Sequence, residues 1–242
     1  YAKYRSDPSK EASSELSPYF HSGQISTHEV FEKISELEAW SPESIDPKMV
    51  GRREGWWGSS DNFESFMDEL ITWRELGYHT CVRRANYNQY SSLPEWAIKT
   101  LHEHSFDERE HIYSLDELTY SQTHDEIWNA AQNQLRTQGV IQNYLRMLWG
   151  KKILEWTPNP QIALSYMITL NDRYSLDGRD PNSYSGVFWI LGRYDRAWGP
   201  ERNIFGKIRY MTSDSTARKF NLKPYLEKWG NESLDISTSI SK

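Results

Sequence analysis

The feature that most constrains the fold is the period at which apolar residues recur, which is that of α-helices. Between residues 63 and 71, apolar side chains stand at positions i, i+3, i+4, i+7 and i+8, a spacing that places them on one helix face. Ser26 and Thr123 are each followed, three residues later, by a Glu, as in the capping boxes that open helices. The sustained alternation of apolar and polar residues typical of strands is nearly absent. We therefore predict one all-α domain.

Proline and glycine residues suggest where the helices begin and end. Pro94 suits the first turn of a helix over 94–104, and Gly139 suits the end of the helix opened near Thr123. Further helices are predicted over 141–156 and 161–171, whereas 41–60 is predicted to be a long loop. The predicted domain covers residues 1–230, and 231–242 is predicted to be a polar C-terminal tail.

Composition limits the setting in which the chain works. The 242 residues contain no apolar run long enough for a membrane span and only one cysteine, Cys81, which excludes an internal disulfide framework. The first residues do not resemble a secretory signal. We therefore expect a monomer in the cytoplasm with no membrane partner. His102 and His104 lie among acidic residues in a stretch predicted to be a solvated loop, so we predict no metal site.

The net charge of −6 argues at first against a nucleic-acid partner. The charges are unevenly distributed, however. Residues 103–126 contain eight Asp and Glu against one Arg, while residues 136–209 contain eleven Lys and Arg against six Asp and Glu. A basic face on an acidic protein is therefore compatible with the sequence.

The predicted helix over 141–156 is apolar on most of its faces, which predicts a central position. It nevertheless carries Arg146, whose burial would be costly without an anionic partner or ligand. Trp149 and Trp156 lie seven residues apart on nearly the same face. From spacing alone, the simplest interpretation is that both are core tryptophans.

Four segments resemble those of a known family. They read LSPYFHSGQIS (16–26), NYLRMLWGKKILEW (143–156), LNDRYSLDGRDPN (170–182) and GKIRYM (206–211). They closely resemble the cofactor half of class II DNA photolyases, and the resemblance extends from Tyr1 to about Trp229. It implies an all-α domain of the photolyase/cryptochrome type, bound FAD, and light-driven repair of cyclobutane pyrimidine dimers in DNA.

The resemblance also implies residues that hold the flavin. The positions matching those that hold its diphosphate are Tyr1, Ser13, Ser14, Leu16 and Ser17. Arg146 and Asp177 match a charge pair beside the flavin ring, which would supply the anionic partner that Arg146 needs. Asn171 matches the side chain facing flavin N5, and Gly178 and Arg179 match a loop at the flavin edge. From sequence alone, Asn171 fits a helix C-cap equally well.

Tryptophans have two functions in this family. Trp149, Trp128 and Trp156 match the chain that passes an electron to photoexcited oxidised flavin. Trp73 and Trp189 match aromatic walls of a lesion pocket, which would hold flipped bases by stacking. Glu69 matches an acid that hydrogen-bonds the dimer, and Met147 matches a residue against it.

The sequence also departs from the family pattern. The N-terminal half that carries an antenna pigment in typical members is missing, and the chain begins at a residue expected to contact FAD, so we expect a truncated or short form. Ser6, Ser22 and Gln142 replace residues usual in the family. Two alternatives therefore stay open, namely a cryptochrome-like flavin photoreceptor without repair activity and a non-catalytic flavoprotein fragment.

Overall fold

The computed structural model describes residues 1–230, and its regular elements are all helical. Within this range no strand forms, and the only β-type pairing is an isolated antiparallel bridge between Arg202 and Gly206. The all-α prediction is therefore confirmed. The predicted tail lies outside the described residues. In chain order the elements are α1 (Ser17–His21), α2 (Thr27–Leu37), η1 (Pro42–Ser44), η2 (Pro47–Met49), α3 (Asp61–Met67), η3 (Asp68–Trp73), α4 (Arg74–Arg83), η4 (Tyr90–Ser92), α5 (Glu95–Glu103), α6 (Leu115–Thr119), α7 (Glu126–Gln138), α8 (Asn143–Glu155), α9 (Pro160–Tyr174), α10 (Pro181–Ile190), α11 (Ser213–Lys219) and α12 (Lys223–Trp229).

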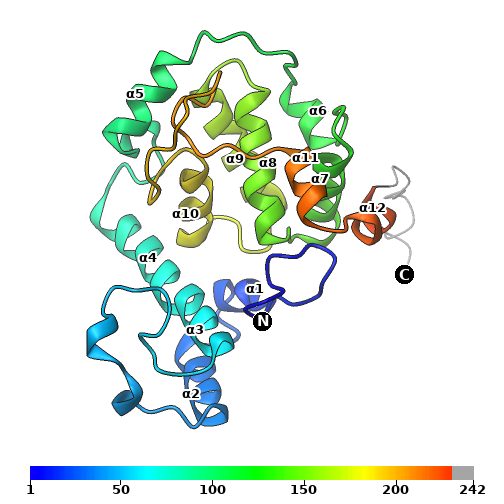
Figure 1. Ribbon diagram of the computed structural model, residues 1–242. Helices are drawn as coiled ribbons and strands as arrows, with labels where there is room; N and C mark the ends of the chain where they lie inside the picture. Colours follow the sequence, from blue (N-terminus) through cyan, green and yellow to red (C-terminus); the bar gives the residue numbers. More distant parts are fainter. Residues whose placement is uncertain (231–242) are drawn as a thin grey trace.

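Helix α8 is the centre of the larger part of the molecule, as the sequence predicted. It packs against α7, α9 and α10 (Figure 1). Gly150 permits the close approach, because a Cβ at this position would collide with Ile190 and lie 3.1 Å from the sulfur of Met167. The core around α8 contains most of the buried apolar side chains, including Trp128, which is completely buried.

A second, smaller core lies at the other end of the molecule. It consists of Val30, Phe63, Met67 and Leu70, with half-buried aromatic side chains packed around them. Helices α2 and α3 and the loop between them form this smaller lobe, while α4 runs from it to pack against α10 (Figure 1). The chain therefore forms two helical lobes joined through α4.

The structure confirms one predicted helix start and corrects two others. Ser26 caps α2 as predicted, because its side chain accepts a hydrogen bond from the Glu29 N–H. The capping box at Thr123 is wrong, since Asp125 caps α7 and accepts from the Trp128 N–H. Pro94 is the N-cap of α5 rather than a residue of its first turn. These differences move a helix start by one or two residues and leave the fold unchanged.

The apolar stripe over 63–71 belongs to a longer helical run than predicted. Helices α3 and α4 are joined without a break by η3, a π-helical segment. Such wider turns occur frequently at functional sites, because they alter which side chains share a face. Among residues 1–230, no helix has both the length and the apolar character that a membrane crossing requires.

Candidate functional site

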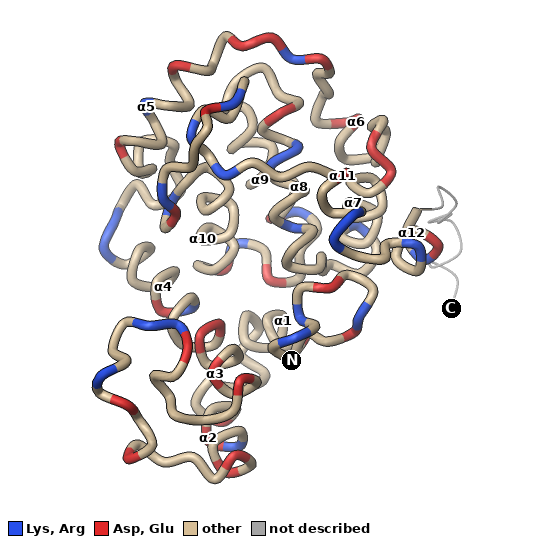
Figure 2. Tube along the Cα trace, in the orientation of Figure 1, with Lys and Arg blue, Asp and Glu red and all other residues tan. Residues whose placement is uncertain are grey.

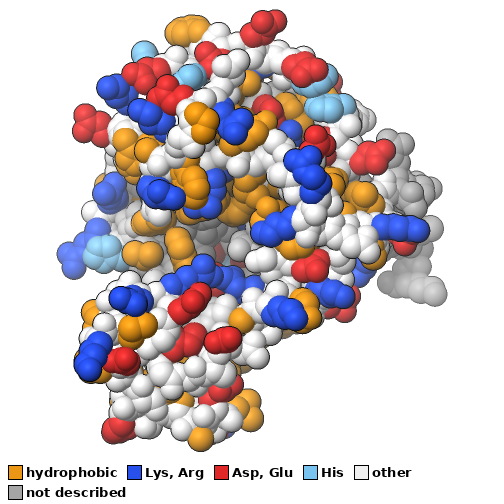
Figure 3. All heavy atoms as spheres, in the orientation of Figure 1, with side chains coloured by type: hydrophobic (Ala, Val, Ile, Leu, Met, Phe, Trp, Pro, Cys, Tyr) orange, Lys and Arg blue, Asp and Glu red, His pale blue; other side chains and the backbone are white. Residues whose placement is uncertain are grey.

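A large cleft of about 1900 Å³ lies between the two lobes. Its lining comes from the N-terminal residues, the 50–56 loop, η3, the start of α8, α10 and the segments after α10. Figure 3 shows this hollow, with hydrophobic side chains in its wall and Lys and Arg side chains around its mouth. Small-molecule pockets typically measure about 300–1,000 Å³. The cleft therefore has room for a large cofactor together with part of a substrate.

The cleft is basic although the whole chain is acidic. Ten Lys and Arg residues line it, against five Asp and Glu. The acidic stretch over 103–126 runs along the top of Figure 2, at the end of the molecule opposite the smaller lobe. This separation agrees with the uneven charge distribution along the sequence, and it makes the cleft suitable for a polyanion.

The residues predicted to hold a diphosphate form one wall of the cleft. All five of them line it, namely Tyr1, Ser13, Ser14, Leu16 and Ser17. Ser17 begins the short helix α1, while Ser13 and Ser14 are exposed. Burial and the neighbouring Glu69 raise the pKa of the Tyr1 phenol to about 12, so this hydroxyl stays protonated and can donate a hydrogen bond. The wall therefore offers hydroxyl donors suited to phosphate oxygens.

Arg146 organises a polar cluster at the start of α8. Its Nη1 donates to Asn171 Oδ1 at 2.8 Å. Burial would raise the pKa of the Asp177 carboxyl, but the charge of Arg146 and the hydroxyls of Ser175 and Ser17 lower it below its ordinary value. Arg146 and Asp177 both line the cleft. The structure thus brings Arg146 and Asp177 to one site. Their charged atoms lie more than 4.0 Å apart, so these two residues, both within the described range, do not form a direct ion pair.

Asn171 lies behind Arg146 rather than at the surface of the cleft. It is 4% exposed and belongs to the last turn of α9, which ends at Tyr174 and is capped by Ser175. The alternative that Asn171 is a helix C-cap is therefore wrong. The buried Oδ1 of Asn171 accepts a hydrogen bond from Arg146 and thereby orients the Arg146 guanidinium.

Gly178 and Arg179 form the tight turn between α9 and α10. A Cβ on Gly178 would lie 3.0 Å from the Asn171 carbonyl oxygen. Arg179 has a φ of 69°, and its N–H donates to Asp172 Oδ1 at 3.1 Å. Neither residue lines the cleft. In this structure they shape the loop that presents Asp177.

The four residues predicted to contact a lesion all line the cleft: Glu69, Trp73, Met147 and Trp189. Glu69 and Trp73 belong to η3, Met147 to α8 and Trp189 to α10. Cationic groups lie near the Trp189 ring, with Lys151 Nζ 5.1 Å and Arg209 Cζ 5.3 Å from its centroid.

Two residues that bind these side chains were not predicted from the sequence, namely Arg5 and Asp68. Arg5 Nη1 lies 2.6 Å from Glu69 Oε1. Burial raises the pKa of the Glu69 carboxyl, although Arg5 opposes this shift. Asp68 Oδ2 accepts a hydrogen bond from Trp73 Nε1 at 3.2 Å, a pairing across the wide turn of η3. Both partners fix side chains that line the cleft.

The predicted electron-relay tryptophans form a continuous buried group. The ring centroids of Trp128 and Trp149 lie 6.5 Å apart with nearly parallel planes, and those of Trp128 and Trp156 lie 5.7 Å apart. Trp128 Nε1 donates to the Trp149 carbonyl at 3.0 Å, and Trp149 Nε1 donates to Gln132 Oε1 at 2.8 Å. None of the three lines the cleft. Their group extends from α8 toward half-buried Tyr113, 5.4 Å from Trp156.

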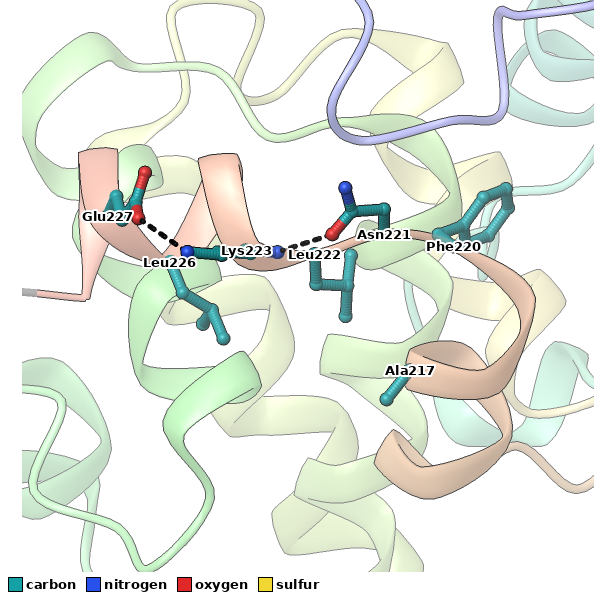
Figure 4. A pocket seen from close by; sticks show the side chains of 7 residues that line it. All are labelled: Ala217, Phe220, Asn221, Leu222, Lys223, Leu226 and Glu227. Atoms are coloured by element: carbon teal, nitrogen blue, oxygen red, sulfur yellow. Dashed lines mark hydrogen bonds and ion pairs between the residues drawn. The ribbon is translucent and has the colours of Figure 1, made fainter.

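A second hollow lies between α11 and α12 (Figure 4). Its polar contacts are an exposed ion pair of 3.9 Å between Lys223 and Glu227 and a hydrogen bond from the Lys223 N–H to Asn221. None of the predicted site residues lines it. Within the described part of the chain, no group of three or more His, Cys, Asp or Glu is placed to hold a metal ion.

Comparison with known proteins shows that the chain is similar to photolyases. No family model matches the chain. It is 42% identical over 228 residues to the deoxyribodipyrimidine photo-lyase of Methanothermobacter thermautotrophicus, 41% identical over 228 residues to that of Oryza sativa subsp. japonica, and 40% identical over 225 residues to that of Potorous tridactylus. These matches cover 93–94% of the chain.

The chain is thus homologous to deoxyribodipyrimidine photo-lyases along nearly all of its own length. It spans 46%, 41% and 39% of the length of these three relatives, respectively. The predicted resemblance to photolyases is confirmed at this level. The class II subtype and the predicted roles of single residues stay predictions.

Proposed function

We propose that the chain binds FAD and repairs cyclobutane pyrimidine dimers in DNA when illuminated. The observation that carries this proposal is the meeting of two predicted residue sets in one cleft. Of the residues assigned to the flavin, those that line the cleft are Tyr1, Ser13, Ser14, Leu16, Ser17, Arg146 and Asp177, whereas Asn171, Gly178 and Arg179 do not line it. The residues assigned to the lesion lie on η3, α8 and α10. A cofactor and a flipped-out pyrimidine dimer held by these sets would lie side by side.

The donor set of the cleft fits FAD. The hydroxyls of Ser13, Ser14 and Ser17 suit the diphosphate, and Lys10 and Lys219 add positive charge to the same cleft. Arg146 and Asp177 can meet the polar edge of a flavin ring with a donor and an acceptor. In its reduced state, bound FAD would supply the light-driven electron that splits the dimer.

The chain's own residues would position the lesion. Trp73 and Trp189 offer flat faces on which bases stack. Glu69, held by Arg5 at 2.6 Å, would present a carboxyl oxygen that accepts a hydrogen bond from a pyrimidine N–H. Met147 would exclude water from the same contact. The buried rings of Trp128, Trp149 and Trp156, with neighbouring centroids 5.7 and 6.5 Å apart, would pass an electron to photoexcited oxidised flavin.

The deciding experiment is a repair assay on the purified chain loaded with FAD and reduced chemically. Near-ultraviolet light should remove thymine dimers from an oligonucleotide, and a dark sample should not. Glu69→Gln should slow repair, whereas Glu29→Gln, an exposed change on α2, should not. A flavin-loaded chain that leaves dimers intact would contradict the proposal and favour a photoreceptor without repair activity. A chain that takes up no flavin would contradict both.

A further inference from the structure

The loop over residues 47–58, here called the arm, is held in a defined position at its base. Trp40 Nε1 donates to the Trp57 carbonyl at 2.7 Å, and the Trp40 and Trp57 rings pack in the smaller core with centroids 5.5 Å apart. The buried carboxylate of Glu64 accepts a hydrogen bond from the Gly55 N–H at 3.2 Å. The arm is therefore anchored to α3 and presents a fixed set of side chains.

The side chains that the arm presents to the cleft are cationic and aromatic. Arg52, Arg53 and Trp56 line the cleft. Arg53 Nε lies 3.5 Å from Asp68 Oδ2, yet 63% of the Arg53 side chain is exposed. A guanidinium has five N–H donors, so most of those on Arg53 remain free for a ligand. Arg52 is exposed as well.

The position of Arg52 and Arg53 indicates a contact with the DNA strand that flanks the lesion. Asp68, the partner of Arg53, also accepts from the indole of Trp73, so the arm adjoins the wall assigned to the lesion. A base held against Trp73 remains joined to its neighbours by phosphates, and those phosphates must pass the rim of the cleft. Arginine binds phosphate oxygens with paired donors.

We propose that the arm is a phosphate-binding rim, in which Arg52 and Arg53 contact the backbone of the DNA strand flanking the lesion. This inference rests on the proposed function. The arm would add contacts that are independent of the base sequence and that position the DNA strand. Because each phosphate contact releases counterions, the contribution of the arm depends on salt concentration.

The test measures the affinity of the FAD-loaded chain for a duplex with a single thymine dimer between 50 and 200 mM salt. The slope of log affinity against log salt is negative, and each lost phosphate contact makes it less steep by roughly 0.9. Arg52→Ala/Arg53→Ala should therefore make the slope less steep by roughly 1.8. The loss of affinity between 50 and 200 mM salt should then be roughly twelvefold smaller than in the wild type. Arg52→Lys/Arg53→Lys keeps the charges and should retain most of the slope.

The matched control is Lys33→Ala/Lys99→Ala, which removes two exposed cations that do not line the cleft. Its slope should equal that of the wild type. An unchanged slope in the double arginine variant, with lesion binding by the wild type intact, would overturn the rim and leave the proposed function standing. A wild-type chain that does not prefer dimer-containing DNA would instead contradict the proposed function itself.

Discussion

The ion pair between Arg5 and Glu69 joins the N-terminal segment to η3 in the lining of the cleft, and its removal should lower the stability of the fold. The two side chains are 14% and 33% exposed, respectively. Removing one partner of a fully buried pair costs about 3–5 kcal/mol. Because Glu69 retains a third of its exposure, we expect Arg5→Ala to lower the free energy of unfolding by about 2–3 kcal/mol at pH 8.

The loss should depend on pH with a definite sign. Burial raises the pKa of Glu69 above 4.5 in the folded chain, and Arg5 opposes that shift, so Arg5→Ala raises the pKa further. A carboxyl with a raised folded pKa stabilises the fold at low pH, and this stabilisation is lost as the pH rises through that pKa. The cost of Arg5→Ala should therefore grow from about 1 kcal/mol, while the carboxyl is neutral, to its full value.

Urea unfolding followed by tryptophan fluorescence at several pH values between 4.5 and 8 measures this difference. Replacing the carboxyl as well, in Arg5→Ala/Glu69→Gln, should flatten the pH dependence, because no titrating group then remains at the pair. A cost below about 1 kcal/mol at pH 8, typical of an exposed pair, would refute the reasoning. So would a cost that does not change with pH.

Three further outcomes are expected. Trp149→Phe should slow photoreduction of oxidised flavin in the FAD-loaded chain and spare repair by chemically reduced flavin, and equal photoreduction rates would count against the relay. Gly150→Ala should cost about 1–3 kcal/mol in urea unfolding because it overpacks α8 against Ile190, whereas Gly186→Ala, with open space at its Cβ, should cost nothing. Burial lowers the pKa of Lys151 to about 7, so wild-type stability should rise between pH 7 and 10.5, and this rise should shrink in Lys151→Met.

The helices α2, α5, α7, α8 and α9 could be predicted because they depend on local patterns, whereas α10, which carries Trp189, was not predicted. The 141–156 segment is apolar on most of its faces, and the structure places α8 at the centre of the bundle. Local competition explains the errors at helix ends. Thr123 and Asp125 can both cap a helix, and the hydrogen bond that forms is the one from the Trp128 N–H to Asp125.

The assembly of the cleft could not be predicted from spacing. Arg5 lies 64 residues before its partner Glu69, and nothing in the local sequence indicates such a contact. The wide turn at η3 also escaped prediction, because an apolar stripe at helical spacing continues through it. The resemblance to photolyases assigned roles to eleven residues that line the cleft, whereas Arg5 and Asp68, the partners of Glu69 and Trp73, became evident only from the packing.

The division of the hydrophobic interior into two cores has a consequence for how the protein opens. The smaller core has four buried apolar side chains among the described residues, so it should exchange its amide hydrogens faster than the bundle around α8. A ligand bound between the lobes would contact both of them and stabilise the smaller lobe against local opening. Its binding should therefore slow exchange most in α2 and α3, which contribute few of the contacts to the ligand itself.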